Sequence, residues 1–298
     1  MLAASRVVGD HGWVTPELGP VDTSRLRLPA GPVDLRRIAT DATPGLEEKE
    51  EGAAAMRSLA PRLADLQERL WAAGQSGSRR RVLLVLQGMD TSGKGGTIRK
   101  ALGLVDPQGL QITSFKAPTP EELRHDFLWR IRRSLPDPGR IGVFDRSHYE
   151  DVLVQRVRSM AEPEEIERRY AAIREFEAEL VADEVSVVKC MLHVSADVQR
   201  KRLRARLDNP EKYWKYNPGD VDERAVWSDY RSAYEVALER TDAESAPWFV
   251  VPADKKWFRN LAVAQILAET LVGLDLGWPA ADFDVEVEKA RLEELVVE

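Results

Sequence analysis

Residues 82–97 read Val-Leu-Leu-Val-Leu-Gln-Gly-Met-Asp-Thr-Ser-Gly-Lys-Gly-Gly-Thr and carry the strongest structural signal in the chain. The run from Val82 to Leu86 is apolar throughout and too short for a helix, which is typical of a strand buried on both faces. The next residues have the spacing of a phosphate-binding loop, and a helix is predicted to begin near Lys94. Backbone N–H groups of such a loop bind phosphate oxygens, and the lysine adds a positive charge. The predicted phosphate ligands are Gly88, Ser92, Gly93, Lys94, Gly95, Gly96 and Thr97.

Two positions in this loop differ from the usual pattern. Gly95 stands where a Ser or Thr that binds Mg²⁺ commonly follows the lysine, and Asp90 places a carboxylate inside an anion-binding loop. An anion there is unfavourable unless it faces a cation, so Asp90 is predicted to replace the missing hydroxyl in metal binding. The alternative is that Asp90 only caps an N–H group of the loop.

Strand and helix patterns alternate after the loop. Further strands are predicted at 111–116, 141–144, 185–194 and 248–251, and a helical pattern follows each of them. Five strand–helix alternations predict an α/β fold with a five-stranded parallel sheet that has helices on both faces.

One of these helices is predicted from Thr119 onward. Thr119 and Glu122 have the spacing of a capping box, and Pro120 occupies the first helical position. The predicted helix carries apolar residues at every fourth position, namely Leu123, Phe127, Ile131 and Leu135.

The chain before the loop divides into two parts. Residues 1–45 contain five prolines and little apolar periodicity, which predicts an extended arm that lies on the rest of the protein. Apolar residues at helical spacing from Met56 to Leu70 predict an amphipathic helix that Pro61 kinks or restarts. The predicted organisation is an arm at 1–45, a phosphate-loop domain at 46–275 with a lid at about 200–222, and a C-terminal tail at 276–298.

Composition excludes several classes of protein. The 298 residues are 43% hydrophobic and 31% charged, which excludes general disorder, and no apolar run approaches the ~20 residues of a membrane helix. The single cysteine, Cys190, excludes an internal disulfide framework. Residues 1–13 lack the apolar segment of a signal peptide, so the predicted compartment is the cytoplasm. With a net charge of −7, the protein must bind any polyanion through a local basic cluster.

A second polar pair follows the predicted strand at 141–144. Ligands of doubly wound sheets bind beyond the carboxyl ends of the strands, so Asp145 and Arg146 are expected beside the phosphate loop. Asp90 and Asp145 then form a predicted Mg²⁺ site. Arg146 suits charge stabilisation of a transferring phosphoryl group, which favours transfer over hydrolysis. The alternative is an Asp–Arg pair that only closes a turn.

The residues just beyond this pair supply a candidate acceptor side. Glu150 and Asp151 follow the strand end by five and six residues, so at least one is expected to reach the acceptor side of the transferring phosphate.

The basic cluster lies at 200–220, where seven basic residues stand against three acidic ones. We predict a lid that closes over phosphates and excludes water, whereas a solvated basic helix face is the alternative. The predicted phosphate ligands of this lid are Arg202, Arg206, Lys212 and Lys215. A second set, predicted to extend the positive surface, comprises Lys116, Arg124, Arg130, Arg132 and Arg133. Lys116, Arg130 and Arg133 of this set are predicted phosphate ligands.

Six motifs resemble those of the polyphosphate kinase 2 family, over about Glu47 to Leu274. They are Gly88–Thr97, Ser114–Thr119, His125–Arg130, Phe144–Leu153, Arg206–Lys212 and Ala246–Trp248. The resemblance implies a three-layer α/β/α fold similar to thymidylate kinase, with a helical lid. It also implies Mg²⁺-dependent transfer of a terminal phosphoryl group between inorganic polyphosphate and a nucleotide, and an assembly of two or four copies.

The resemblance assigns catalytic positions to Asp90, Lys94, Asp145 and Arg146, and it places Arg206 in the lid motif. The Ser147-His-Tyr-Glu-Asp151 form is similar to members that accept nucleoside monophosphates as well as diphosphates. Many of those members carry Asp at the position of Gly95 and Asn at the position of Asp145, so this chain mixes two patterns.

Residues and resemblance together predict conversion of AMP to ADP, and of ADP to ATP, at the expense of polyphosphate. Neither nucleic acid nor a membrane is an expected partner. One alternative is an ATP-dependent small-molecule or nucleotide kinase of the same fold. A nucleotide-binding switch is a third hypothesis, which substitution of Lys94 distinguishes from an enzyme.

Overall fold

A parallel sheet of five strands forms the centre of the protein. The computed structural model describes residues 6–8, 14–16, 18–29 and 31–295. The strands are β3 (Arg81–Gln87), β4 (Leu110–Ser114), β5 (Ile141–Asp145), β6 (Val185–His193) and β7 (Trp248–Pro252), in the spatial order β4-β5-β3-β6-β7. All neighbouring pairs are parallel, which confirms the predicted sheet.

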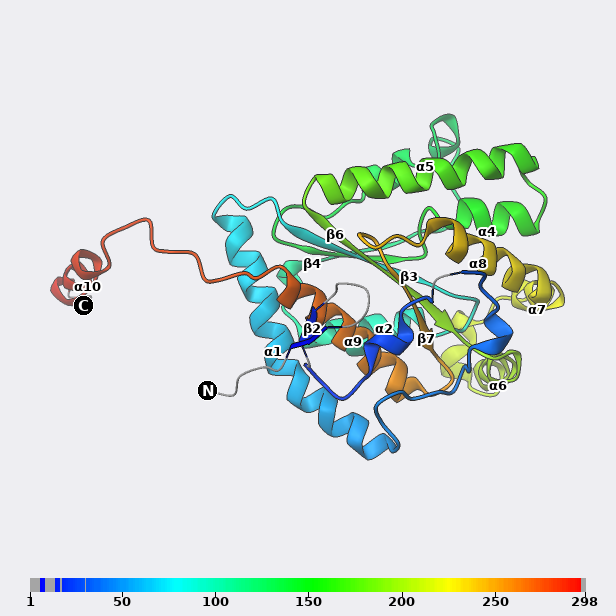
Figure 1. Ribbon diagram of the computed structural model, residues 1–298, viewed down its shortest axis with the longest axis horizontal. Coiled ribbons are helices and arrows are strands. Elements are labelled where there is room, and N and C mark those ends of the chain that lie inside the picture. The colour runs from blue at the N-terminus through cyan, green and yellow to red at the C-terminus, as the bar shows by residue number, and fades with distance from the viewer. Residues whose placement is uncertain (1–5, 9–13, 17, 30, 296–298) are drawn as a thin grey trace.

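Helices cover both faces of this sheet (Figure 1). One layer consists of α1 (Lys49–Gln75), α2 (Lys94–Ala101) and α9 (Lys256–Gly273), and the other of α4 (Glu150–Val157), α5 (Pro163–Ala182) and α8 (Trp227–Thr241). Successive residues of β3 face opposite layers: Leu84 belongs to the core under α1 and α9, and Leu83 to the core under α5 and α8. The apolar run at 82–86 is therefore buried on both sides, as its composition predicts.

The remaining elements complete the described part of the chain. They are β1 (Arg6–Val8) and β2 (Val14–Pro16), which pair antiparallel; α3 (Trp129–Arg132), α6 (Ala196–Leu207), α7 (Gly219–Ala225) and α10 (Val285–Glu294); and 3₁₀ turns at Thr23–Leu26, Leu35–Arg37, Leu102–Leu104, Pro107–Gly109, Glu122–Arg124 and Pro210–Lys215. Figure 1 shows α6 and α7 together beside β7, and α10 standing away from the rest of the chain.

The prediction of one helix from Thr119 through Leu135 is wrong. Both capping-box bonds between Thr119 and Glu122 form, but they open only a 3₁₀ turn that ends at Arg124. His125 is extended, and the side chain of Asp126 accepts a hydrogen bond from the N–H of Leu128 at 3.0 Å. This local side-chain bond competes with a continuous helix, so only the four-residue α3 follows.

The segment from 18 to 46 crosses from one layer to the other around the edge of the sheet at β7. Val21 and Leu26 are buried in the core under α1 and α9, whereas Leu28 and Leu35 are buried in the core under α5 and α8. Between them, the N–H of Leu28 donates to the carbonyl of Trp248 at 3.0 Å. These residues complete both cores, while the arm and tail boundaries remain predictions.

The helix predicted around Met56 is α1, which continues through Pro61 as one element without a restart. Within the described ranges of the chain, no helix combines the length and apolar character needed to cross a membrane.

Candidate active site

The loop from Gly88 to Gly93 joins β3 to α2 and turns through three residues with positive φ. These are Gly88 at 147°, Thr91 at 62° and Gly93 at 109°. The φ of Gly93 favours glycine, and a Cβ atom there would lie 1.9 Å from Nη1 of Arg259 and displace that guanidinium. The predicted strand–loop–helix unit is therefore present, and the loop leads directly into the N-terminus of α2.

Lys94 folds back across the loop. Its Nζ donates to the carbonyl oxygen of Gly88 at 2.8 Å, and the residue is only 8% exposed. Burial lowers the pKa of the Lys94 ammonium, and the neighbouring Arg146 guanidinium lowers it further. The carboxylates of Asp90, Asp145 and Glu150 oppose this shift, which places all four charged groups around the lysine.

Arg146 lies at the centre of a cluster of acids. Its Nη2 is 2.6 Å from Oδ1 of Asp90, and its Nη1 is 3.5 Å from Oε2 of Glu150. Burial opposes its charge, but the carboxylates of Glu150 and Asp90 raise the pKa of Arg146 above its usual value. Arg146 therefore stays cationic at the end of β5, facing the phosphate loop.

Asp145 is brought to the loop by the register of the sheet, in which it pairs with Leu86 of β3. In the part of the chain that the structure describes, its carboxylate makes no direct hydrogen bond or ion pair. Asp90 has one oxygen on Arg146. The described residues contain no group of three or more acids, histidines or cysteines able to hold a metal. Two carboxylates suit Mg²⁺, which keeps several waters and substrate oxygens as ligands.

Glu150 and Asp151 differ sharply in their surroundings. The side chain of Glu150 is 18% exposed beside Arg146, and burial raises the pKa of its carboxyl group. Asp151 lies between two guanidinium groups, 3.7 Å from Arg130 and 3.7 Å from Arg169. Of these two acids, only Glu150 is in direct contact with a candidate catalytic residue, Arg146.

Arg202 holds the shape of the phosphate loop from α6. Its Nη1 donates to the carbonyls of Thr91 and Ser92 at 2.9 and 3.1 Å, and its Nη2 donates to those of Ala253 and Asp254 at 2.6 and 3.0 Å. Its donors thus contact backbone oxygens, although the sequence predicts phosphate contacts.

Arg259 on α9 is a loop contact that the sequence analysis missed. It is 3% exposed, and its Nη1 donates to the same Ser92 carbonyl at 3.0 Å. Burial, with a smaller contribution from the Arg202 charge, lowers the pKa of Arg259 to about 10. The available signal was an arginine inside the otherwise apolar run of α9, but its partner lies 167 residues away in the chain.

Two further residues form hydrogen bonds with the backbone of the loop, and the sequence did not predict either of them. The hydroxyl of Tyr234 on α8 accepts a hydrogen bond from the N–H of Gly88 at 3.1 Å. Gln199 on α6 donates to the carbonyl of Asp90 at 3.0 Å, and Arg224 on α7 donates to the side-chain oxygen of Gln199 at 2.8 Å. Helix α6 is therefore hydrogen-bonded to the phosphate loop, and α7 is connected to the loop through Gln199.

The lid positions separate into an anchor and exposed cations. Nη1 of Arg206 donates to the carbonyl of Lys215 at 2.8 Å and lies 3.3 Å from Asp220. Lys212 is exposed, and the Nζ of Lys215 lies 4.7 Å from the ring centroid of Trp214, which is itself 78% exposed. Arg206 thus closes the turn that presents two lysines and an aromatic ring to solvent.

The second basic set does not form one surface. Arg130 is buried, and its Nη1 donates to the carbonyl of Lys116 at 2.9 Å. Arg133 is exposed and stacks on Trp129 with its Cζ 4.8 Å from the ring centroid, and the side chain of Lys116 is exposed as well. Arg130 therefore supports the strand end, while Lys116 and Arg133 remain available at the surface.

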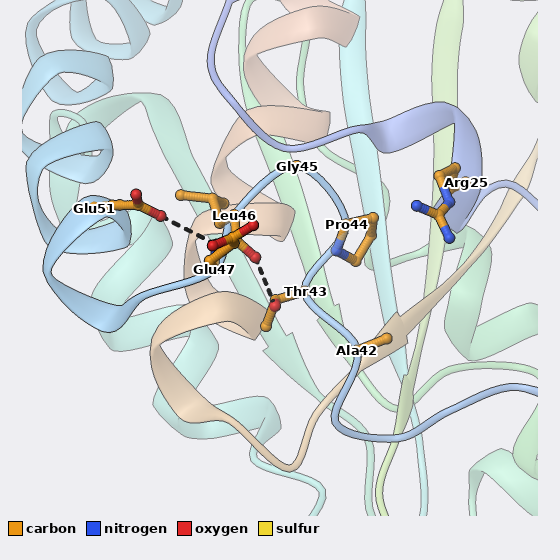
Figure 2. Close-up of a pocket in the computed structure, with 8 residues that line it drawn as sticks. All are labelled: Arg25, Ala42, Thr43, Pro44, Gly45, Leu46, Glu47 and Glu51. Atoms are coloured by element: carbon orange, nitrogen blue, oxygen red, sulfur yellow. Dashed lines mark hydrogen bonds between the residues drawn. The ribbon is translucent and has the colours of Figure 1, made fainter.

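A hollow of about 550 Å³ lies away from this cluster, where the N-terminal segment meets the start of α1 (Figure 2). Oε2 of Glu51 accepts a hydrogen bond from the N–H of Glu47 at 3.0 Å, and Oγ1 of Thr43 donates to the carbonyl of Leu46 at 2.7 Å. Glu51 also belongs to the capping box at the start of α1, and the hollow contains none of the predicted site residues.

Comparisons with known proteins match this chain along most of its length. Residues 46–275 match the family model described as polyphosphate kinase 2. The AMP/ADP-polyphosphate phosphotransferase of Meiothermus ruber is 46% identical over 252 residues, which are 84% of this chain and 93% of that protein. The ADP-polyphosphate phosphotransferase of Rhodopseudomonas palustris is 43% identical over 289 residues, 93% of this chain and 96% of that protein.

A solved structure gives the same result in three dimensions. The crystal structure of polyphosphate kinase 2 from Arthrobacter aurescens TC1 is 51% identical and superposes with a TM-score of 0.90. The match covers 93% of this chain and 98% of that one. Sequence and overall fold therefore agree with the same group of proteins.

Proposed function

The chain belongs to the polyphosphate kinase 2 family, and we propose that it transfers a terminal phosphoryl group between inorganic polyphosphate and a nucleotide, converting AMP to ADP and ADP to ATP. One observation carries this proposal: Lys94, Asp90, Asp145 and Arg146 converge where β3 and β5 end, with Arg146 2.6 Å from Asp90. These are the groups that phosphoryl transfer needs, namely cations for the phosphate oxygens and carboxylates for a metal.

The residues act by positioning and by charge. The loop N–H groups and Lys94 bind the oxygens of the terminal polyphosphate group, and Arg146 neutralises negative charge that spreads over them in the transition state. An oxygen of the nucleotide's terminal phosphate attacks in line, the bond to the next polyphosphate unit breaks, and no covalent enzyme intermediate is needed. A Mg²⁺ ion held by Asp90 and Asp145 would supply further charge neutralisation to the phosphates.

The lid supplies the polyanion contact in this proposal. Lys212 and Lys215 project from the turn that Arg206 anchors, so they meet the polyphosphate chain, while α6 and α7 exclude water from the loop. Arg202 supports the loop backbone instead of contacting phosphate. Lys116 and Arg133 extend the positive surface on the β4 side.

Glu150 is the proposed acceptor-side carboxylate. It contacts Arg146 and remains partly exposed, whereas Asp151 is enclosed by Arg130 and Arg169. The proposed assembly is a homo-oligomer, with no nucleic acid or membrane partner.

The test is a donor and acceptor panel with purified protein and Mg²⁺. Polyphosphate is supplied with AMP, ADP, GMP or GDP in separate reactions, and ATP replaces polyphosphate in a parallel set. Formation of ADP and ATP from polyphosphate supports the proposal. Turnover with ATP as the only effective donor contradicts it and identifies an ATP-dependent kinase of the same fold.

A further inference from the structure

An ion pair lies inside the protein, behind the active site. Lys189, in the middle of β6, is fully buried, and Glu177 on α5 is 3% exposed. Their charged atoms Nζ and Oε2 are 2.5 Å apart. Neither side chain contacts the phosphate loop, so the mechanism above gives this pair no direct part.

Every donor of the lysine has a partner. Besides Glu177, Nζ contacts the carbonyl of Thr241 at 2.7 Å and the hydroxyl of Tyr149 at 3.2 Å. The Tyr149 hydroxyl donates in turn to Oε1 of Glu177 at 2.7 Å. Lys189, Glu177 and Tyr149 therefore form a closed triangle, called here the buried triad.

The buried triad is joined through the chain to the catalytic arginine. Tyr149 is three residues after Arg146, and its N–H donates to Oγ of Ser147 at 3.3 Å. The Ser147 hydroxyl also forms a hydrogen bond with the side-chain amide of Gln87 on β3 at 3.1 Å. The N–H of Arg146 donates to the carbonyl of Leu86 at 3.1 Å. The turn from 146 to 149 is thus held on β3 at its start and on the buried triad at its end.

The backbone of this turn needs such support. Arg146 has a φ of 65°, a left-handed conformation that costs a non-glycine residue energy and persists only where its surroundings enforce it. The triad also holds the carbonyl of Thr241 at the end of α8, the helix whose Tyr234 binds the N–H of Gly88. One buried group therefore contacts both elements that frame the phosphate loop.

Stability alone is a poor reason to bury these charges. Burying an ion pair costs more free energy than burying two apolar side chains of similar volume. Replacing both charged partners by apolar residues therefore often leaves a protein equally stable. We propose that Lys189, Glu177 and Tyr149 are positioning residues for phosphoryl transfer, which hold the 146–149 turn so that Arg146 faces the phosphate loop. This inference rests on the proposed function.

The first experiment removes one hydroxyl. Tyr149→Phe keeps the ring and breaks two contacts of the triad, and the matched control is Tyr170→Phe, a buried tyrosine of α5 outside the triad. We expect Tyr149→Phe to lower kcat by about 10-fold with little change in KM for polyphosphate or nucleotide, because misplacement of a catalytic group weakens the transition state more than substrate binding. The control should retain wild-type kinetics.

A double-mutant cycle separates positioning from general damage. In an Arg146→Lys background, Tyr149→Phe should lower kcat by less than about 2-fold, because the group that it positions is already altered. An equal loss in both backgrounds, or a wild-type kcat for Tyr149→Phe, overturns the proposal. The double variant Lys189→Met with Glu177→Leu, which removes both charges, should keep the thermal midpoint and show the same selective fall in kcat.

Hydrogen exchange tests the inference without any assay of activity. Peptides that contain 145–150 should exchange faster in Tyr149→Phe than in wild type and in Tyr170→Phe, with other peptides unchanged. Unchanged exchange at 145–150 overturns the positioning role. If wild-type protein transfers no phosphate from polyphosphate, the proposed function fails, and the exchange measurement still decides whether the triad holds this turn.

Discussion

Nη2 of Arg146 lies 2.6 Å from Oδ1 of Asp90, so the end of β5 and the phosphate loop of β3 are joined by one ion pair. Both residues are partly exposed, with side-chain accessibilities of 39% and 26%. In the proposed mechanism, a phosphate group in the loop would meet this arginine, and a metal ion would use the second oxygen of the aspartate. The proposed substrate and metal sites therefore share this ion pair.

Removal of either aspartate should weaken metal binding. Asp90→Asn and Asp145→Asn are each expected to raise the Mg²⁺ concentration for half-maximal activity by about 10-fold or more, because each removes one anionic ligand. Asp151→Asn is the matched control, since that carboxylate lies between two arginines. Magnesium titrations measure the effect. Wild-type titration curves in both loop variants would assign Asp90 and Asp145 to structure.

Loss of the loop lysine should abolish most of the turnover. Lys94→Ala removes the charge that we propose contacts the transferring phosphate, so kcat is expected to fall by about 100- to 1000-fold. Lys100→Ala, an exposed lysine of the same helix, should be unaffected. Steady-state kinetics and circular dichroism measure activity and fold. An unchanged kcat in Lys94→Ala would contradict the assignment of the phosphate site.

The lid should make polyphosphate binding sensitive to salt. Charge contacts from Lys212 and Lys215 weaken as ionic strength rises, and Arg206→Ala releases the turn that carries them. We expect KM for polyphosphate to rise steeply with salt in wild type and to be raised at low salt in Arg206→Ala. Lys201→Ala, on the same helix and exposed, is the control. Salt-independent binding would favour a basic face that only interacts with water.

The acceptor prediction separates mono- from diphosphates. AMP should be phosphorylated by polyphosphate, and the ADP formed should be carried on to ATP more slowly. Glu150→Ala should impair AMP use more than ADP use, because this carboxylate is beside Arg146 on the acceptor side. Chromatography of products from separate reactions measures both steps. Turnover of ADP with no turnover of AMP at millimolar concentration would indicate a diphosphate-specific enzyme.

The N-terminal segment should respond to pH through Glu269 on α9. Thr23 donates to this carboxyl group at 2.7 Å, and burial raises its pKa from 4.5 to about 6. The folded protein then binds the proton more tightly than the unfolded chain, so the stabilising contribution is complete below pH 4.5 and is lost as the pH rises through 6. The difference between the pKa of Glu269 in the unfolded chain and its pKa in the folded protein limits this contribution to about 2 kcal/mol.

Thermal midpoints across that pH range provide the measurement. Glu269→Gln should flatten the decline between pH 4.5 and 6, whereas Glu293→Gln on the exposed α10 should leave it unchanged. A wild-type slope in Glu269→Gln would assign the pH dependence to other groups.

Strands and the phosphate loop could be predicted because short-range patterns determine them. Residues 82–86 are apolar on both faces, and the spacing from Gly88 to Lys94 imposes a particular turn. The segment 119–135 could not be predicted correctly, because the fourfold apolar spacing does not reveal that the Asp126 side chain accepts a hydrogen bond from the N–H of Leu128. A local side-chain contact of 3.0 Å outweighed the pattern.

The arginines show how far the candidate site could be predicted from the sequence. Spacing places Arg202 and Arg206 on one helical face, but it does not say whether that face meets phosphate or backbone carbonyls. Arg259 and Tyr234 reach the loop from α9 and α8, more than 140 residues away in the chain. Such contacts depend on how helices pack across the sheet, which no short stretch of sequence contains.

The left-handed backbone of Arg146 links catalytic activity to the stability of the folded protein. A glycine there would relieve a conformational cost of about 1–2 kcal/mol, yet it would delete the guanidinium at the centre of the acidic cluster. Selection for thermal stability alone would thus favour substitutions in this turn that abolish activity. Engineering for longer working life should therefore leave residues 145–150 untouched and seek its gains on the solvent faces of α1 and α5.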